Sequence, residues 1–261
     1  MLQYQEYAPC GAVATYVATY WNFEASPQAE AVEHEIIPDG CISIALRRAG
    51  PHSPAGLRIV GPRATSFRVR INAGDSYFGI RFWPDAGAAA LHMDACALRD
   101  QVRPAAEVLL GGAEEIMRVL IACRGVPDLV IACDALLPRV LRNGRPIDPH
   151  VRHAVMLMIG AEGDVPIGTL PAHIGIGLRQ LQRRFRACVG LTMKEFARIR
   201  RVRAAAAALL GGGRESAARL AVRAGFSDQA HFIRELTRVT GAAPTALRMR
   251  LAAIRHRDLW F

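Results

Sequence analysis

Two stretches near the C-terminus carry the same pattern of glycines and apolar residues, about fifty positions apart. In each, a short helical run ends at a glycine, an apolar residue follows, and a second helical run places two apolar residues four positions apart. The matching pairs are Gly175 and Gly225, Ile176 and Phe226, Leu181 and Phe232, Phe185 and Leu236, Gly190 and Gly241, Met193 and Pro244, and Phe196 and Leu247. The last five pairs share an offset of 51 residues. A shared offset of this kind is typical of a duplicated structural unit.

Each repeat is predicted to fold as two helices joined by a tight turn. In the second repeat, Gly225 can take the left-handed conformation that ends a helix, and Phe226 can fill the space between two helices. Ser227 or Asp228 can then cap the next helix, in which Phe232 lies on the buried face. Helix, tight turn and helix together form the helix-turn-helix motif.

A long helix over residues 193–210 is predicted to join the two repeats. Its apolar stripe consists of Phe196, Ile199, Val202, Ala206 and Leu209. Alanine, the best helix former, fills much of its second half, so we expect a firm rod. Such a rod would hold the second helix of each repeat at a fixed separation. Two helices that enter successive major grooves on one face of B-DNA must lie about 34 Å apart. We therefore predict that the outer faces of these helices bind DNA.

The side chains predicted to read bases project from the second helix of each repeat. They are Arg179, Gln182, Arg183 and Arg186 in the first repeat, and Ser227, Gln229, His231 and Arg234 in the second. Arginine pairs well with guanine and glutamine with adenine. Arg183 and Arg234 hold equivalent places in the repeat, which favours a shared role. Four more arginines are expected to contact phosphate, which positions a protein on DNA without specifying sequence: Arg200, Arg201, Arg203 and Arg238.

Charge is distributed unevenly along the chain. Residues 1–147 hold 14 basic and 15 acidic residues, whereas residues 148–261 hold 19 basic and 8 acidic residues. A basic region joined to a nearly neutral one indicates a polyanionic partner for the basic part. A solvated basic surface would show the same balance, so the charge supports the DNA prediction but does not establish it.

The first part of the chain has the pattern of an antiparallel sheet. Residues 1–82 alternate apolar and polar residues in places, as at Phe67, Val69 and Ile71, and turns are predicted at Pro38–Gly40. Helices are predicted over residues 85–100, 113–124 and 127–143. Further helices are expected at 151–160, 166–173, 177–188, 193–210, 215–223, 227–240 and 244–255. The predicted class is α+β: a barrel-like or sandwich-like β-rich region with helices over residues 1–145, then an all-α region over 150–255. The boundary is placed at the Pro- and Gly-containing segment 144–150.

The C-terminal pattern resembles the DNA-binding domain of the AraC/XylS family of bacterial transcription regulators. The matching pieces are "GIGLRQLQRRFRACVGLTMKEFARIRRV" and "AGFSDQAHFIRELTRVTGAAPTALR". The resemblance implies two helix-turn-helix units joined by a long helix, with base-facing residues at Arg179, Gln182, Arg183, Gln229 and Arg234. The chain departs from the family pattern at Pro171 inside the first helix, at Gly177 in place of a serine cap, and at Met193 in place of a proline. Residues 1–145 resemble the sensor-type domain of a subset of these regulators, and no ligand follows from that.

Three other kinds of function could account for parts of the sequence. A cupin-like metalloenzyme could use His34, Glu35, His52 and His92, but the chain shows no H-x-H spacing and no nucleophile elbow or phosphate loop. A redox- or metal-responsive regulator could act through Cys10, Cys41 or His34, because an activated cysteine needs a basic or helix-N-terminal setting. Most of the six cysteines are expected to be core residues. DNA binding of a purely architectural kind would leave residues 1–145 without a role.

The sequence thus predicts a sequence-specific DNA-binding transcription regulator that is not an enzyme and needs no metal or cofactor. Its partner is double-stranded DNA, and a small-molecule effector, RNA polymerase and a second copy of the chain are further candidates. The N-terminal residues lack the basic and apolar regions of a signal peptide. No apolar stretch is long enough to span a bilayer, so we expect no membrane partner and a cytoplasmic protein.

Overall fold

The computed structural model describes residues 2–48, 55–109, 112–141, 144–210 and 217–257. It confirms the α+β class, because strands occupy much of residues 2–104 and helices dominate the rest. The main sheet has seven strands in the order β8-β5-β4-β7-β2-β1-β9. Their bounds are β1 Leu2–Tyr7, β2 Val17–Ala25, β4 Ser43–Arg47, β5 Gly56–Val60, β7 Ser76–Phe82, β8 Val102–Pro104 and β9 Ile254–Arg257. Neighbouring strands are antiparallel except for β1 and β9, which are parallel.

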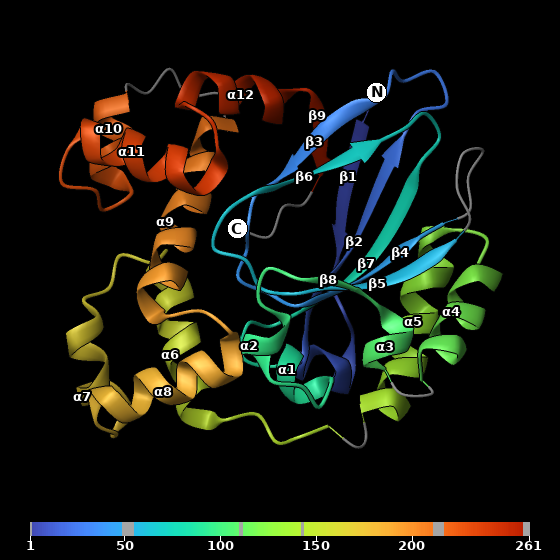
Figure 1. Cartoon of the computed structure of the whole chain (residues 1–261), viewed down its shortest axis with the longest axis horizontal. Coiled ribbons are helices and arrows are strands. Elements are labelled where there is room, and N and C mark those ends of the chain that lie inside the picture. The colour runs from blue at the N-terminus through green and yellow to red at the C-terminus, as the bar shows by residue number, and fades with distance from the viewer. Residues whose placement is uncertain (1, 49–54, 110–111, 142–143, 211–216, 258–261) are drawn as a thin grey trace.

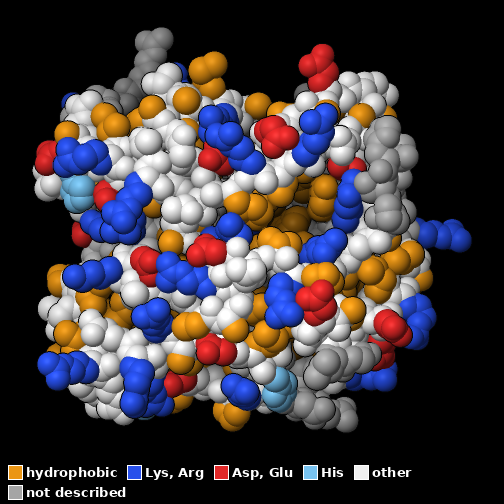
Figure 2. All heavy atoms as spheres, in the orientation of Figure 1, with side chains coloured by type: hydrophobic (Ala, Val, Ile, Leu, Met, Phe, Trp, Pro, Cys, Tyr) orange, Lys and Arg blue, Asp and Glu red, His pale blue; other side chains and the backbone are white. Residues whose placement is uncertain are grey.

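A second, two-stranded sheet lies beside the main one. It consists of β3 (Val32–Ile36) and β6 (Phe67–Ile71), which pair antiparallel. The predicted alternation is present in β6, where Arg68 and Arg70 are exposed and Ile71 is buried. Ile71 packs with Leu2 and Phe23 of the main sheet. Figure 2 shows hydrophobic side chains at the bottom of a hollow in this part of the molecule, with Lys and Arg side chains around it.

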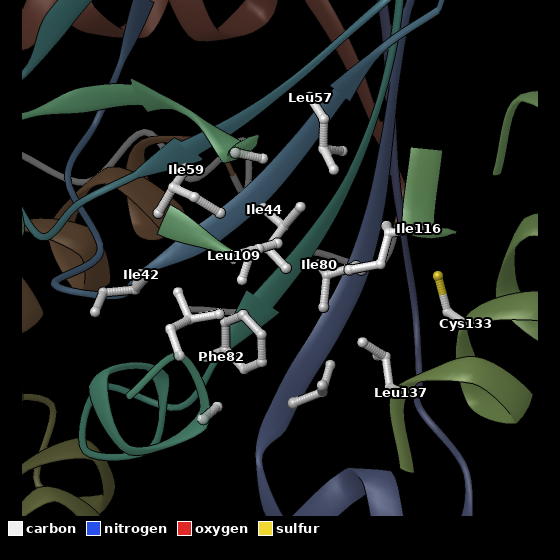
Figure 3. Packing of buried hydrophobic residues seen from close by; sticks show 14 of the residues in the cluster. Ile42, Ile44, Leu57, Ile59, Ile80, Phe82, Leu109, Ile116, Cys133 and Leu137 are labelled. Carbon is white, nitrogen blue, oxygen red and sulfur yellow. The ribbon is translucent and has the colours of Figure 1, made fainter. Parts of the chain in front are cut away.

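Short helices follow the strands and cover one face of the main sheet. They are α1 (Gly87–Ala90), α2 (Ala95–Leu98), α3 (Ala105–Val108), α4 (Gly112–Ala122) and α5 (Val126–Val140). Figure 3 shows Ile116 of α4 and Leu137 of α5 beside Ile80 of the sheet, and all belong to one buried cluster. The helices α4 and α5 are therefore mainly core helices, although Ile121 of α4 and Ile131 of α5 are exposed.

The remaining helices form the C-terminal region, at the left of Figure 1. They are α6 (Pro149–Gly160), α7 (Leu170–Ile174), α8 (Leu178–Val189), α9 (Met193–Leu210), α10 (Ala217–Arg223), α11 (Gln229–Thr240) and α12 (Pro244–Ala252). The helix α9 is the predicted rod. Its first half packs in one apolar core with α6 and α8, and its second half packs in another with α10, α11 and α12. Each helix-turn-helix unit therefore has its own core, and α9 belongs to both.

Two of the predicted helices differ from the observed ones. The helix expected over 244–255 ends at Ala252, and residues 254–257 instead form β9, which pairs with Leu2–Gln5 of β1. The strand form could not be read from four residues because its partner lies at the other end of the chain. The helix expected over 166–173 is divided into a 3₁₀ turn, η3 (Ile167–Thr169), and α7. Pro171 consequently lies in the first turn of α7, where its missing N–H costs no helical hydrogen bond.

The segment Gly144–Asp148 contains no helix or strand and leads into α6. The division of the chain into units at 145 and 150 nevertheless stays a prediction. Among the described residues, no helix is long and apolar enough to cross a membrane.

Candidate DNA-binding interface

The second helix-turn-helix unit consists of α10 and α11. Gly225 ends α10 with φ +68°, in the left-handed region that favours glycine. Phe226 is buried, and its ring lies 5.3 Å from that of Phe232. The carboxylate of Asp228 accepts a 2.7 Å hydrogen bond from the backbone N–H of His231, which is the expected N-cap. Local sequence thus accounts for both the turn and the start of α11.

The first unit consists of α7 and α8 and is fixed in a different way. Gly175 has φ +82°, as the turn requires, but Gly177 at the N-cap has no side chain to cap α8. On the inner side of α8, Arg184 Nε donates to Asp148 Oδ2 at 2.6 Å. Asp148 also caps α6 by accepting from the backbone N–H of His150 and of Val151. Partial burial by itself raises the pKa of Asp148, but these hydrogen bonds hold it below its usual value.

The predicted base-facing side chains lie on the outer surface of α8 and at the start of α11. Seven of the eight are exposed: Arg179, Gln182, Arg183, Arg186, Ser227, Gln229 and Arg234. His231 is half-buried, with Nδ1 3.0 Å from Ser227 Oγ and its ring edge-on to Phe226. Figure 2 shows Lys and Arg side chains spread over the helices at the left of the view. The two helices therefore present arginine and glutamine to solvent, and contact of these residues with DNA stays a prediction.

The expected phosphate contacts at Arg200 and Arg203 do not fit the structure. The two residues are only 2% and 7% exposed, and both lie inside the molecule rather than on the DNA side of α9. Arg203 Nη1 is 3.4 Å from the carbonyl oxygens of Ile37 and Pro38, which it can reach only from the interior. Burial and the charge of Arg203 lower the pKa of Arg200 to about 10. A sequence signal existed, because Arg200 and Arg203 lie four and seven positions after Phe196 and so share the side of α9 that carries this apolar residue.

The other two phosphate candidates differ from each other. Arg201 is half-buried, donates to the carbonyl oxygen of Gly225 at 3.1 Å and lies over the ring of Phe226. Its visible role is to hold the turn of the second unit. The side chain of Arg238 is 64% exposed at the end of α11, with Glu235 3.9 Å away. Of the four candidates, Arg238 alone keeps a position from which it can contact phosphate.

The N-terminal region contacts both units, which sequence reasoning did not predict. At the first unit, Arg99 binds both carboxylate oxygens of Glu195, at 2.7 and 3.3 Å. Glu195 also completes a capping box with Thr192 at the start of α9. Although burial alone would raise it, hydrogen bonds from Arg99 and Thr192 lower the pKa of Glu195 to about 2. At the second unit, Glu35 of β3 forms an ion pair with Arg250 of α12. These contacts join residues far apart in the sequence, so no local sequence pattern predicts them.

Among the candidate residues for metal or redox chemistry, His34, Glu35 and Cys41 are stacked, ion-paired or buried. His34 stacks on Phe23, with ring centroids 5.1 Å apart, and Glu35 is engaged by Arg250 and Ser66. Over the described part of the chain, no three His, Cys, Asp or Glu side chains could hold a metal ion together. His52 lies outside the described residues. Cys41 is buried, and desolvation raises the pKa of its thiol well above the usual value, which disfavours a reactive thiolate.

Two known families match this chain, one in its N-terminal part and one in its C-terminal part. Residues 170–250 match the family described as a helix-turn-helix domain. Residues 5–104 match a family described as a domain of unknown function (DUF6597). A comparison with curated protein sequences finds no match.

Several solved structures share parts of the fold. A transcriptional regulator with an AraC-type DNA-binding domain from Chromobacterium violaceum is 23% identical over 40% of this chain and 93% of its own, with a TM-score of 0.37. The DNA-binding domain of AdpA, a global transcriptional factor in complex with a target DNA, is 24% identical over 41% of this chain and 96% of its own, with a TM-score of 0.36. ToxT from Vibrio cholerae O395 is 9% identical over 96% of this chain and 97% of its own, with a TM-score of 0.45.

All three TM-scores are below 0.5, so we identify the C-terminal domain from the family match and from the geometry of the two units. Residues 170–250 form a helix-turn-helix domain, with two units that share α9.

Proposed function

We propose that the chain, a DNA-binding transcription regulator, reads two blocks of one double-stranded DNA site. In this proposal α8 enters one major groove and α11 enters the next, one helical turn away. The observation that carries it is the shared rod: α9 packs into the cores of both units, so one helix sets the separation of the two exposed recognition surfaces. Arg183 and Arg234, at equivalent places in the repeat, are the base-reading residues that we propose first.

We further propose that residues 1–145 form a sensor unit that acts on DNA binding through α9. The turn Pro38–Cys41 lies against α9, and a Cβ at Gly40 would come 2.8 Å from the ring of Phe196. In the same turn Asp39 pairs with Arg81 of β7 at 2.7 Å, and Arg81 pairs with Glu6 of β1 at 2.6 Å. Charged side chains thus connect the main sheet to the surroundings of Arg203. A change of state in the sheet would alter the placement of the rod and shift the population able to bind DNA.

The remaining parts of the proposal are a small-molecule effector of unknown identity, a homodimer, and contact with RNA polymerase. We expect the protein to act in the bacterial cytoplasm. No catalytic role is proposed. The output would be a change in transcription next to the DNA site.

The test is selection of bound sequences from a random DNA pool by the full-length chain at two salt concentrations. The expected result is an asymmetric site with two enriched blocks whose centres lie one helical turn apart. Alanine substitutions at Arg183 and Arg234 have a matched control in Arg68→Ala. Arg68 is exposed on β6, so this variant removes one positive charge away from both recognition helices. Binding that is lost with salt, without any enriched sequence, would refute site-specific recognition, because only the phosphate term would remain.

A further inference from the structure

The short helix α2 belongs to the N-terminal region but is anchored on the first DNA-binding unit. Arg99, which directly follows α2, makes the two-point contact with Glu195 of α9. Cys96 Sγ lies 3.3 Å from the carbonyl oxygen of Arg186 on α8. The approach is close at Gly190, where a Cβ would come 2.6 Å from the carbonyl oxygen of Ala95. These contacts hold α2 at the C-terminal end of α8.

A hollow of about 630 Å³ lies between α2 and the recognition surface of α8. Its lining includes Asp94, Cys96, Gln182, Arg183, Arg186 and Lys194. Three of these are predicted base-facing residues, and Lys194 is exposed at the start of α9. Asp94 is exposed and caps α2 by accepting a 2.8 Å hydrogen bond from the backbone N–H of Cys96. A carboxylate of the N-terminal region therefore lies at the edge of the surface that is predicted to face DNA.

A helix in the major groove lies between two phosphate backbones, which carry the dense negative charge of the duplex. We infer that DNA read by α8 runs past α2, and that Asp94 limits the affinity of the first unit by opposing a phosphate. This inference rests on the proposed function, because it needs α8 to be seated in a major groove. The N-terminal region then tunes DNA binding directly, by charge, and not only by moving α9.

The test compares Asp94→Asn with Asp128→Asn in the full-length chain on the selected two-block site. Asparagine caps a helix about as well as aspartate, so α2 should keep its structure. Asp128 is an exposed carboxylate on α5, and its substitution changes the net charge by the same amount away from the hollow. We expect Asp94→Asn to bind about threefold more tightly at low salt, the size expected for removal of one like charge a few ångströms away in water. Asp128→Asn should bind like the wild type.

Two further measurements separate the possible causes. The gain at Asp94→Asn should shrink as salt rises, because the screening length falls from about 30 Å at 0.01 M to about 8 Å at 0.15 M. It should also vanish on a shortened duplex that lacks the phosphates on the α2 side of the α8 block. An equal gain for Asp128→Asn, or an unchanged gain on the short duplex, would overturn the inference. If no variant and no wild-type protein selects a DNA site, the proposed function is wrong and this inference falls with it.

Discussion

The first helix-turn-helix unit begins its recognition helix at Gly177, which offers no side-chain cap, whereas the second begins at Asp228, whose carboxylate accepts from the backbone N–H of His231. The first unit compensates through side chains distant in sequence. Arg184 of α8 binds Asp148, and Glu195 at the start of α9 binds Arg99. The start of the recognition helix is therefore capped locally in the second unit only. Both units tie that helix to a neighbouring element by an ion pair, which is Arg184–Asp148 in the first and Arg198–Glu235 in the second.

The two units also meet the N-terminal region differently. The first is covered at one end by α1 and α2, so its recognition helix lies directly beside that region. The second meets the β3–β6 side, through a 2.7 Å hydrogen bond from the backbone N–H of Ser66 to the carbonyl oxygen of Val239 and through the Glu35–Arg250 pair, and it is joined to the main sheet where β9, after α12, pairs with β1. We propose that the N-terminal region acts more directly on the recognition helix of the first unit, because α1 and α2 lie beside α8.

The largest expected effect comes from emptying equivalent core positions in the two units. Phe185 and Leu236 are fully buried and hold matching places in the repeat. Phe185→Ala should cost about 3–5 kcal/mol and Leu236→Ala about 2–5 kcal/mol of unfolding free energy. Hydrogen exchange should show α8 and α2 losing protection together in the first variant, and α11 alone losing it in the second. Equal loss over both units in both variants would mean that the C-terminal region unfolds as one body and that the comparison fails.

The next effect concerns base reading. Arg183→Ala and Arg234→Ala should each cost about 1–3 kcal/mol of binding free energy at the selected site, and each should relax the base preference of its own block only. Arg238→Ala is the contrasting variant, because an exposed phosphate contact should weaken binding to all sequences and reduce the salt dependence by about one charge. Binding curves on site variants at several salt concentrations distinguish these results. A uniform loss at Arg183 or Arg234 would make that residue a phosphate contact.

Local sequence patterns predict the helix-turn-helix units well, but they do not predict contacts between residues far apart in the chain. The helix-turn-helix units were predictable because glycines at turns and apolar residues at helical spacing are local signals, and α9 has the predicted bounds. Arg200 and Arg203 were placed on the DNA side because an arginine on a helix is usually solvated, and burial against Pro38 depends on a turn more than 160 residues away. The strand β9 was missed for the same reason. Asp148 and Glu195 carry local capping signals, next to Pro149 and three residues after Thr192, but their ion pairs with Arg184 and Arg99 depend on tertiary contact and have no local signature.

A smaller effect tests the ion pair that is specific to the first unit. The pKa of Glu195 falls from its usual 4.5 to about 2, so its pairing stabilises the folded chain above about pH 4.5 and is lost as pH falls towards 2. Because the pair is partly exposed, we expect a contribution of about 1–2 kcal/mol. Glu195→Gln should lose it at pH 7, and the difference from the wild type should close as pH falls through this range. A control at the exposed Glu107, Glu107→Gln, should show no comparable convergence.

The smallest effect concerns the two helix starts themselves. Asp228→Ala removes the cap of α11 and should reduce protection in its first turn, with Asp228→Asn close to the wild type. Gly177→Ser should do the reverse for α8 and stabilise it by roughly a few tenths of a kcal/mol. The serine fits, because Gly177 has φ −63° and ψ 148° and no atom lies within 4 Å of a Cβ placed there. Thermal unfolding of the three variants measures both directions. If Gly177→Ser gives no gain, the start of α8 is already held by the Arg184–Asp148 pair, and tertiary contact has fully replaced the missing cap.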